Sequence, residues 1–315
     1  MKEKYSRHAS LWILVGFCLC LAAFVSLRTN HFLSLKNLVN ILEATSYRLI
    51  LAVGMTFIIG SGAIDLSVGS ILSLSSIVMA MLMRGGMPVA WAVMLGLLFG
   101  TALGAINGAV IYLTRINSLI ITLATSFLYR GLCLILTLGS PVTRLPKAFL
   151  RFGSGDLFGM ESGVTMAAVI LLVSFPLMYR MRWGHYLTAL GGNAEALKRS
   201  GAPIARYRIG SFAAMGALAA LAGVIITARL NSAEPNAGLE MEMSAITAVI
   251  MGGTPLSGGY AQLAGTAVAV FLLGLIRNGL TMMSISSYYL QFITGGLLLI
   301  AVVAAELRER RNRIL

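Results

Sequence analysis

The sequence predicts an all-α, polytopic membrane bundle of about ten transmembrane helices, with one or two broken or re-entrant elements. The 315-residue chain is 58% hydrophobic and only 11% charged, and its mean hydropathy is +0.87. These values lie far outside the range of soluble domains. Long apolar stretches recur between short polar breaks, and about 20 apolar residues suffice for one helical crossing. Runs such as AAVILLVSFPLM are apolar on every face, which excludes the alternating strands of a membrane β-barrel.

The expected spans follow the apolar stretches in order. The first, after the basic start MKEKYSRH, has the outline of a signal peptide, but its cleavage pattern is weak and we expect a retained helix. The stretch 243–253 is too short to cross a ~30 Å hydrocarbon core, so we expect a broken or re-entrant element there. The ten expected spans are residues 11–27, 42–60, 66–83, 89–114, 118–138, 162–180, 208–229, 243–253, 263–282 and 289–305. We expect residues 1–315 to form a single transmembrane domain with a polar loop at about 181–207.

The formal charge of +13 comes from basic residues beside the spans, so it indicates topology and does not require nucleic acid. If both termini are cytoplasmic, fourteen bases lie on the inner face and seven on the outer face, which favours this orientation over its inverse. The inner bases are Lys2, Lys4, Arg7, Arg115, Arg180, Arg182, Lys198, Arg199, Arg206, Arg208, Arg308, Arg310, Arg311 and Arg313. The outer bases are Arg28, Lys36, Arg48, Arg84, Arg144, Lys147 and Arg151. The polar loop 181–207 therefore faces the cytoplasm.

Within this loop, ALGGNAEALKRSG predicts a helix of about two turns. Asn193 can cap its start, Glu195 lies in its first turn, and Lys198 and Arg199 lie in its last turn. Gly201 can end it in a left-handed turn. Such a helix is well below the ~12 residues at which an isolated helix becomes marginal, so it must contact its own bundle or a partner. The alternatives are a connector on the membrane surface and a transverse helix that fits a cleft on a cytoplasmic protein.

The same segment resembles the cytoplasmic coupling segment of permease subunits of ABC importers for simple sugars, the ribose, galactose, xylose and arabinose group. The likeness covers nearly the whole chain, through blocks such as NLVNILEATSYRLILAVGMTFIIGSGAIDLSVGSILSLS, INGAVIYLTRINSLIITLATSFLYRGL, ARLNSAEPNAG, AITAVIMGGTPLSGGYAQLAGT and NGLTMMSISSYYLQ. The resemblance implies a non-enzymatic permease domain in the cell inner membrane.

The resemblance also implies partners. Two permease subunits, a second copy or a related chain, form the pore in the lipid bilayer, two ABC ATPase subunits dock on the loop, and a periplasmic binding protein delivers the sugar. ATP is used by the ATPase partner, and no cofactor is expected on this chain. The resemblance leaves open which sugar is carried. The residues that it assigns to ATPase coupling are Gly191, Gly192, Asn193, Glu195, Ala196, Lys198, Arg199 and Gly201.

Polar and glycine-rich interruptions indicate where a pathway or a structural break lies. In GSGAIDLSVGS, Asp65 stands among small residues, and we expect it to cap the following span rather than to contact sugar. Asn107, beside a stripe of glycines spaced by four, is expected to bond across helices or to a substrate. A sugar path needs amides, hydroxyls and aromatic faces. The candidates for pathway or structural break are Asp65, Ser67, Asn107, Asn117, Thr122, Gly252, Gly253, Asn278 and Tyr288.

The family pattern also suggests an outer mouth, although the acidic pair written there as Glu-Leu-Asp appears here as Glu242, Met243 and Ser244. We expect Arg130 and Arg277, both within spans, to reach an interface or a carbonyl. The family more often has Asn at position 277. The outer-mouth candidates are Arg229, Asn231, Glu234 and Asn236.

Three other functions are weighed against this interpretation. LSGG at 256–259 matches part of the ABC ATPase signature, but no lysine follows a glycine, so the chain lacks a phosphate-binding loop. A proton- or ion-coupled secondary transporter of a small polar solute needs titratable groups in mid-membrane, whereas the carboxylates here are expected at span ends or in loops. No zinc motif or catalytic triad is present, and Cys18, Cys20 and Cys133 lie in apolar runs, so we expect no metal and no catalytic residue.

Overall fold

The computed structural model describes residues 2–29, 31–157, 160–286 and 288–314. Thirteen α-helices and two pairs of very short strands form the regular structure of these residues. The helices are α1 (Lys2–Arg28), α2 (Leu35–Gly60), α3 (Val68–Arg84), α4 (Val89–Thr114), α5 (Ser118–Thr137), α6 (Lys147–Ser154), α7 (Ser162–Tyr179), α8 (Arg182–Gly192), α9 (Ala194–Arg199), α10 (Ile204–Leu230), α11 (Met241–Met251), α12 (Leu263–Met282) and α13 (Tyr288–Ile314).

The helices match the predicted spans in order. Six of them (α2, α4, α5, α7, α10 and α12) are long and apolar enough to cross a membrane, and shorter apolar stretches lie in α1, α3, α11 and α13. Six and four together correspond to the ten expected spans. The prediction of a multi-pass helical membrane bundle is confirmed.

The centre of the bundle is held by close contact between helix backbones. Helix α10 packs along α4 and also contacts α2 and α3. A Cβ added at Gly104 would collide with the carbonyl oxygen of Phe212, and one at Gly100 would lie 2.8 Å from the carbonyl oxygen of Gly216. Only a residue without a side chain allows this approach. The glycines spaced by four on α4 therefore serve helix packing.

The predicted broken element is the segment around α11. This helix has only 11 residues and begins after an irregular stretch, 234–240, in which Pro235 and Gly238 are buried. The backbone N–H of Gly238 donates to Ser73 Oγ on α3 at 3.0 Å, and the backbones of Gly238 and Gly69 are in direct contact. Non-helical backbone at membrane depth is tolerated where protein covers it, and here α3 supplies both the cover and a hydrogen-bond partner.

Some elements were not predicted. The loop at 181–207 contains two helices, α8 and α9, where only the second is expected from its end signals. Strand β1 (Val142–Thr143) pairs antiparallel with β4 (Ser232–Ala233), and β2 (Asp156–Leu157) pairs with β3 (Met160–Glu161). These two-residue strands depend on the proximity of distant segments and leave no local period in the sequence.

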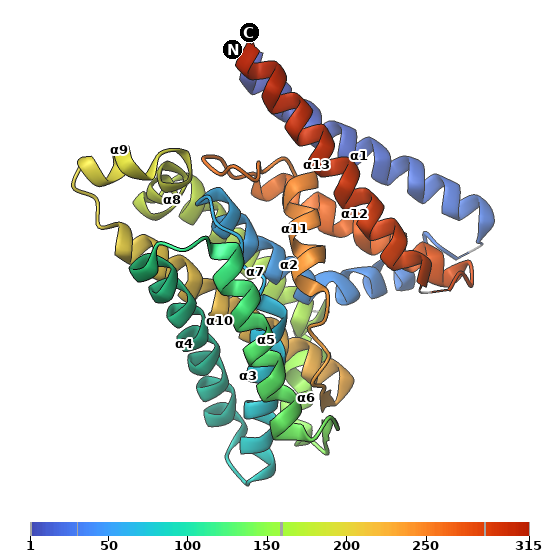
Figure 1. The fold of residues 1–315 in the computed structure, drawn as a ribbon. Coiled ribbons are helices and arrows are strands. Elements are labelled where there is room, and N and C mark those ends of the chain that lie inside the picture. The colour runs from blue at the N-terminus through green and yellow to red at the C-terminus, as the bar shows by residue number, and fades with distance from the viewer. Residues whose placement is uncertain (1, 30, 158–159, 287, 315) are drawn as a thin grey trace.

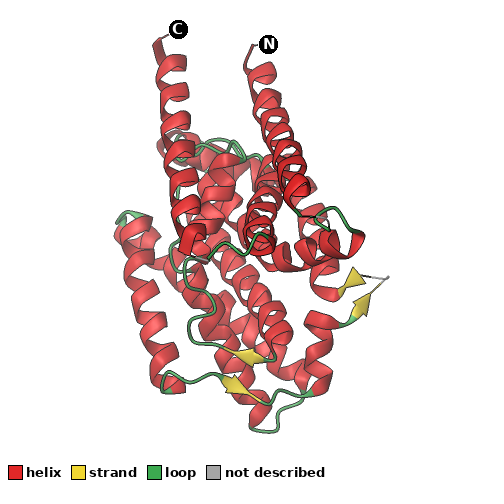
Figure 2. Cartoon of the chain, turned by 90° about the vertical axis from the view of Figure 1, so that its right-hand side faces the viewer, coloured by secondary structure: helices red, strands yellow, loops and turns green. Residues whose placement is uncertain are grey.

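The two ends of the bundle differ in what they carry. The start of α1, the end of α13 and the α8–α9 segment lie toward one end (Figure 1), while α6 and the strands lie toward the other. Figure 2, turned by 90°, shows the same arrangement, with both termini at the end opposite the strands. The polar loop and the basic C-terminal tail therefore share one side of the molecule.

The glycine packing gives a stability prediction. We expect Gly104→Ala to lower the free energy of unfolding by roughly 1–3 kcal/mol, because the new methyl group meets the backbone of α10. Gly131→Ala on α5 is the control, since a Cβ there meets nothing within 4 Å. Thermal unfolding of the purified protein in detergent measures the difference. Equal unfolding temperatures for the two variants would contradict the packing role.

Candidate functional site

Helix α9 has the end structure that the sequence predicts. Asn193 Oδ1 accepts a hydrogen bond from the backbone N–H of Ala196 at 2.9 Å, and Gly201 follows the helix with φ +80°. Glu195 and Arg199 are 4.0 Å apart, with side chains 79% and 84% exposed. No residue of α9 is buried. Its shape is therefore set by its caps, and its side chains are free to meet another surface.

Helix α8 joins α9 to the membrane bundle through what we call the glycine junction, formed by Gly60, Gly62, Gly191, Gly258 and Gly259. Gly259 N–H donates to the carbonyl oxygen of Gly60 at 3.0 Å. A Cβ at Gly191 would lie 2.6 Å from the nitrogen of Gly259 and would collide with the oxygen of Gly60. Gly62, Gly258 and Gly259 have φ between +72° and +82°, which favours glycine. The junction brings the end of α8 into backbone contact with the turns that follow α2 and precede α12.

Aromatic side chains fix α8 and α7 in place beside the junction. Tyr186 of α8 stacks on Tyr207 of α10 with ring centroids 4.8 Å apart, and Trp183 packs on the same ring at 5.2 Å. Tyr179 of α7 donates to the carbonyl oxygen of Ala261 at 3.1 Å and accepts from the N–H of Leu263 at 2.9 Å. These contacts make α8 part of the bundle, so α9 is an exposed element on a fixed base.

Hollows flank α9 on two sides. One, of about 990 Å³, lies between α9 and the ends of α4 and α5, and contains Glu195, Lys198 and Asn117. The other, of about 510 Å³, is lined by α8 and α9 residues that include Gly192, Asn193 and Ala196. The structure thus brings the predicted coupling residues together around one short helix. The sequence analysis did not assign Gly60, Gly258 and Gly259 to the support of α9. The motifs GSG and LSGG that contain them were the available signal.

A buried polar network lies one layer deeper. Asp65 Oδ1 accepts from the N–H and the hydroxyl of Ser67, at 2.8 and 2.6 Å. Ser67 Oγ in turn accepts from Asn107 Nδ2 at 2.8 Å, and Asn107 Oδ1 accepts from the Tyr129 hydroxyl at 3.2 Å. Thr122 Oγ1 accepts from the N–H of Leu66 at 3.0 Å. The network holds the turn after α2 against α4 and α5.

This geometry corrects one expectation. Asp65 is not the cap of α3, because the helix begins at Val68 and the carboxylate bonds to Ser67, one residue before it. Asp65 and Ser67 are fully buried, as are Asn107 and Thr122. None of the four lines the hollows around α9, and all of them bond within the helix packing, which favours the structural-break alternative for these candidates.

The other pathway candidates are scattered. Asn117 caps α5 by accepting from the N–H of Leu119 at 2.9 Å. Asn278 exchanges hydrogen bonds with Asn37 of α2, both at 2.9 Å. Gly252 lies against the backbone of α12 at Gly265 and Thr266, and Gly253 has φ +95° in the following turn. Tyr288 is 82% exposed at the start of α13.

A large hollow of about 1030 Å³ opens at the other half of the bundle, between α2, α10, α11, α12 and α13. We call it the outer hollow. Arg229, Glu234, Asn236 and Tyr288 line it, whereas Asn231 ends α10 in a left-handed conformation. Arg229 pairs with Glu43 at 3.8 Å. Three of the predicted mouth residues therefore line the same hollow as Tyr288. Glu43, which was expected at the end of a span, lies within α2.

Arg130 reaches a carbonyl as predicted. Its Nη1 donates to the carbonyl oxygen of Pro235 at 2.6 Å and lies 3.4 Å from Ser73 Oγ. Because Ser73 also accepts from Gly238, this arginine fastens the irregular stretch before α11 to α3 and α5.

The buried network predicts non-additive mutations. Ser67→Ala removes the acceptor of Asn107 and a donor to Asp65, so we expect it to cost roughly 1–3 kcal/mol of stability. Once Ser67 is gone, Asn107→Ala should cost less than it does alone. Thr101→Val is the control, since that hydroxyl bonds only within α4. Additive losses in thermal unfolding would contradict the network.

Comparisons with known proteins agree with this architecture. A family model described as "Branched-chain amino acid transport system / permease component" matches residues 37–302. The ribose import permease protein RbsC of Escherichia coli is 38% identical over 289 residues, covering 90% of each chain. The D-allose transport system permease protein AlsC of Escherichia coli is 36% identical, covering 95% of this chain and 90% of the relative. The L-arabinose ABC transporter permease protein AraH of Azospirillum brasilense is 32% identical, covering 94% and 87%. No solved structure matches the chain. The chain belongs to this family of transport-system permease components.

Proposed function

We propose that this chain is the membrane-spanning subunit of an ATP-driven ABC importer that translocates a monosaccharide delivered by a periplasmic or extracellular binding protein. The relatives are named for ribose, D-allose and L-arabinose, which share the chemistry of small, neutral, hydroxyl-rich molecules. Residues 1–315 act as a single permease domain in the cytoplasmic membrane. The chain is not itself the ATPase, which is a separate subunit.

The observation that carries the coupling role is the placement of α9. The exposed, capped helix α9 follows α8, and the end of α8 is part of the glycine junction. The junction contacts the end of α2 and the turn before α12. A partner that displaces α9 would therefore push on membrane helices through backbone contacts. Such contacts have no flexible side chains to absorb the movement.

The orientation follows from charge. The excess of fourteen bases over seven favours cytoplasmic termini, and α9 lies toward the same end as the termini. An ATPase subunit then meets α9 from the cytoplasm, while the binding protein meets the face that carries α6 and the short strands. The pore is completed by a second copy or a related permease.

Uptake in membrane vesicles tests the proposal. We expect uptake of a labelled monosaccharide to require ATP, the ATPase subunit and the binding protein, and to persist when an uncoupler collapses the proton gradient. Vesicles with this chain alone are the control. Uptake driven by a proton or sodium gradient without ATP would overturn the proposal in favour of a secondary transporter.

The cap of α9 gives a second test. Asn193→Ala removes a hydrogen bond worth about 1 kcal/mol from a six-residue helix, so we expect uptake to fall about five-fold. Asn193→Asp keeps an acceptor at the same position and should retain uptake. The uptake per ATP hydrolysed is measured beside the amount of chain in the membrane. Equal loss in both variants would contradict a role for the cap.

Surface charge on α9 gives a third test. Because Glu195 is exposed, we expect Glu195→Arg to leave membrane insertion and folding intact but to uncouple ATP hydrolysis from uptake. Gly201→Val, which strains a residue at φ +80°, should act in the same direction. Association of the ATPase is measured by co-purification. Unchanged association and unchanged uptake in both variants would refute docking on α9.

A further inference from the structure

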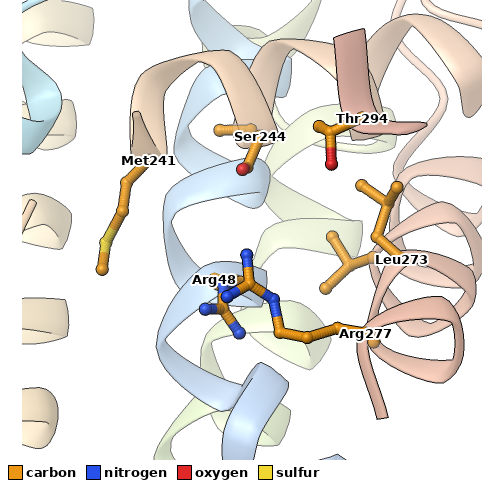
Figure 3. Close-up of a pocket in the computed structure, with 9 residues that line it drawn as sticks. Arg48, Met241, Ser244, Leu273, Arg277 and Thr294 are labelled. Atoms are coloured by element: carbon orange, nitrogen blue, oxygen red, sulfur yellow. The ribbon is translucent and has the colours of Figure 1, made fainter. Parts of the chain in front are cut away.

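Two arginines occupy one wall of the outer hollow. Arg48, which the sequence analysis counts with the outer-face bases, lies midway along α2. Arg277 lies on α12. Both also line a small cavity of about 20 Å³. Figure 3 shows their guanidinium groups side by side, with the hydroxyl oxygens of Ser244 and Thr294 directed toward the same space. Two positive groups thus converge from separate helices.

Neither arginine of this pair forms an ion pair within the part of the chain that the structure describes. Among the described residues, no carboxylate lies within 4.0 Å of either guanidinium. Within the described residues, Arg48 donates to the carbonyl oxygen of Ala44, at 2.8 Å, and lies over the Tyr47 ring. Glu240 lines the same hollow and acts on Arg277 from beyond 4.0 Å. It keeps its negative charge, because its oxygens accept from the neutral amide of Gln291, at 2.9 Å.

The remaining charges of the outer hollow are also engaged. Arg229 pairs with Glu43, and Glu234 Oε1 accepts from the Ser232 hydroxyl at 3.0 Å. Arg48 and Arg277 repel each other, and their repulsion grows as the surroundings lose water. Charged side chains inside a membrane protein usually face a water-filled space and are paired there. This pair lies beside the hollow, and among the described residues neither arginine has a carboxylate within 4.0 Å.

We propose that Arg48 and Arg277 bind an oxyanion, the carboxylate or phosphate group of a ligand that enters the outer hollow. Two guanidinium groups match such a group because each offers planar donors for paired hydrogen bonds. The hydroxyl of Ser244 lies on the same side of the space. The hollow of about 1030 Å³ accepts either a small organic acid or phosphate, or the headgroup of an anionic lipid.

The binding experiment uses the full chain in nanodiscs of phosphatidylcholine. Thermal unfolding is followed with sodium gluconate, inorganic phosphate or ribose, with ionic strength held constant by sodium chloride. A second arm replaces part of the phosphatidylcholine by phosphatidylglycerol, without added anion. We expect gluconate or phosphate to raise the unfolding temperature if the oxyanion is soluble, and phosphatidylglycerol to raise it if the oxyanion belongs to a lipid. Ribose should have no effect through this pair.

Variants identify the site. Arg277→Asn and Arg48→Gln should weaken the apparent affinity by about ten-fold or more, equivalent to about 1.4 kcal/mol. Arg277→Lys keeps the charge without the planar fork and should lose less. Arg84→Gln, on the exposed end of α3 outside the hollow, is the matched control and should bind as the unmodified protein does.

The proposal is overturned if no oxyanion shifts the unfolding temperature in either arm. It is equally overturned if the shift is the same in Arg277→Asn as in the unmodified chain, or if ribose alone gives a shift that depends on the pair. If Arg277→Asn does not fold, Arg277→Lys and Arg48→Gln decide the question. The measurement needs no ATP and no partner subunit, so its failure leaves the importer proposal standing.

Discussion

The structure depends on close contacts between the backbones of neighbouring helices, at positions where glycine has no side chain to keep them apart. Inside a bilayer the lipid tails are as apolar as the helices, so close packing and hydrogen bonds must hold the bundle together. Gly104 against Phe212 joins α4 to α10, Gly69 against Gly238 joins α3 to the stretch before α11, and Gly191 against Gly60 joins α8 to α2. Each contact leaves no room for a methyl group. The same packing that stabilises the bundle therefore also makes it rigid at these points.

Polar groups inside the bundle fall into two kinds. The Asp65 network is buried: Ser67, Asn107 and Tyr129 bond to one another and to the turn after α2, while Asp65 Oδ2 has no hydrogen-bond partner among the described residues. Its hydrogen bonds join α4 and α5 to that turn. The outer hollow is open, and among the described residues its arginine pair has no ion-pair partner within 4.0 Å. Burial thus separates residues that hold the fold from residues that can meet a ligand, although both kinds look alike in the sequence.

The sequence predicts what is encoded locally. Apolar runs give the ten spans, and the caps of α9 lie within nine residues of one another, so both could be found without tertiary information. Helix α8 could not, because its mixed sequence is held by stacking of Tyr186 on the distant Tyr207. The glycine junction and the Asp65 network join segments far apart in the chain. The cavity beside Arg48 could not be predicted for the same reason, since a charge within an apolar run gives no sign of the space next to it.

The short helix α11 connects the two functional ends of the molecule. At one end it follows Glu240, which lies on the wall of the outer hollow, and at the other it leads through Gly252 to the turn of Gly258 and Gly259. That turn is held to Gly60 by a hydrogen bond and lies against Gly191 at the end of α8. The end of α8 is therefore connected to the wall of the outer hollow through this turn and α11. Because α11 is only 11 residues long and is bounded by irregular backbone at both ends, it forms a separate segment between these two contacts and not part of a full-length transmembrane helix.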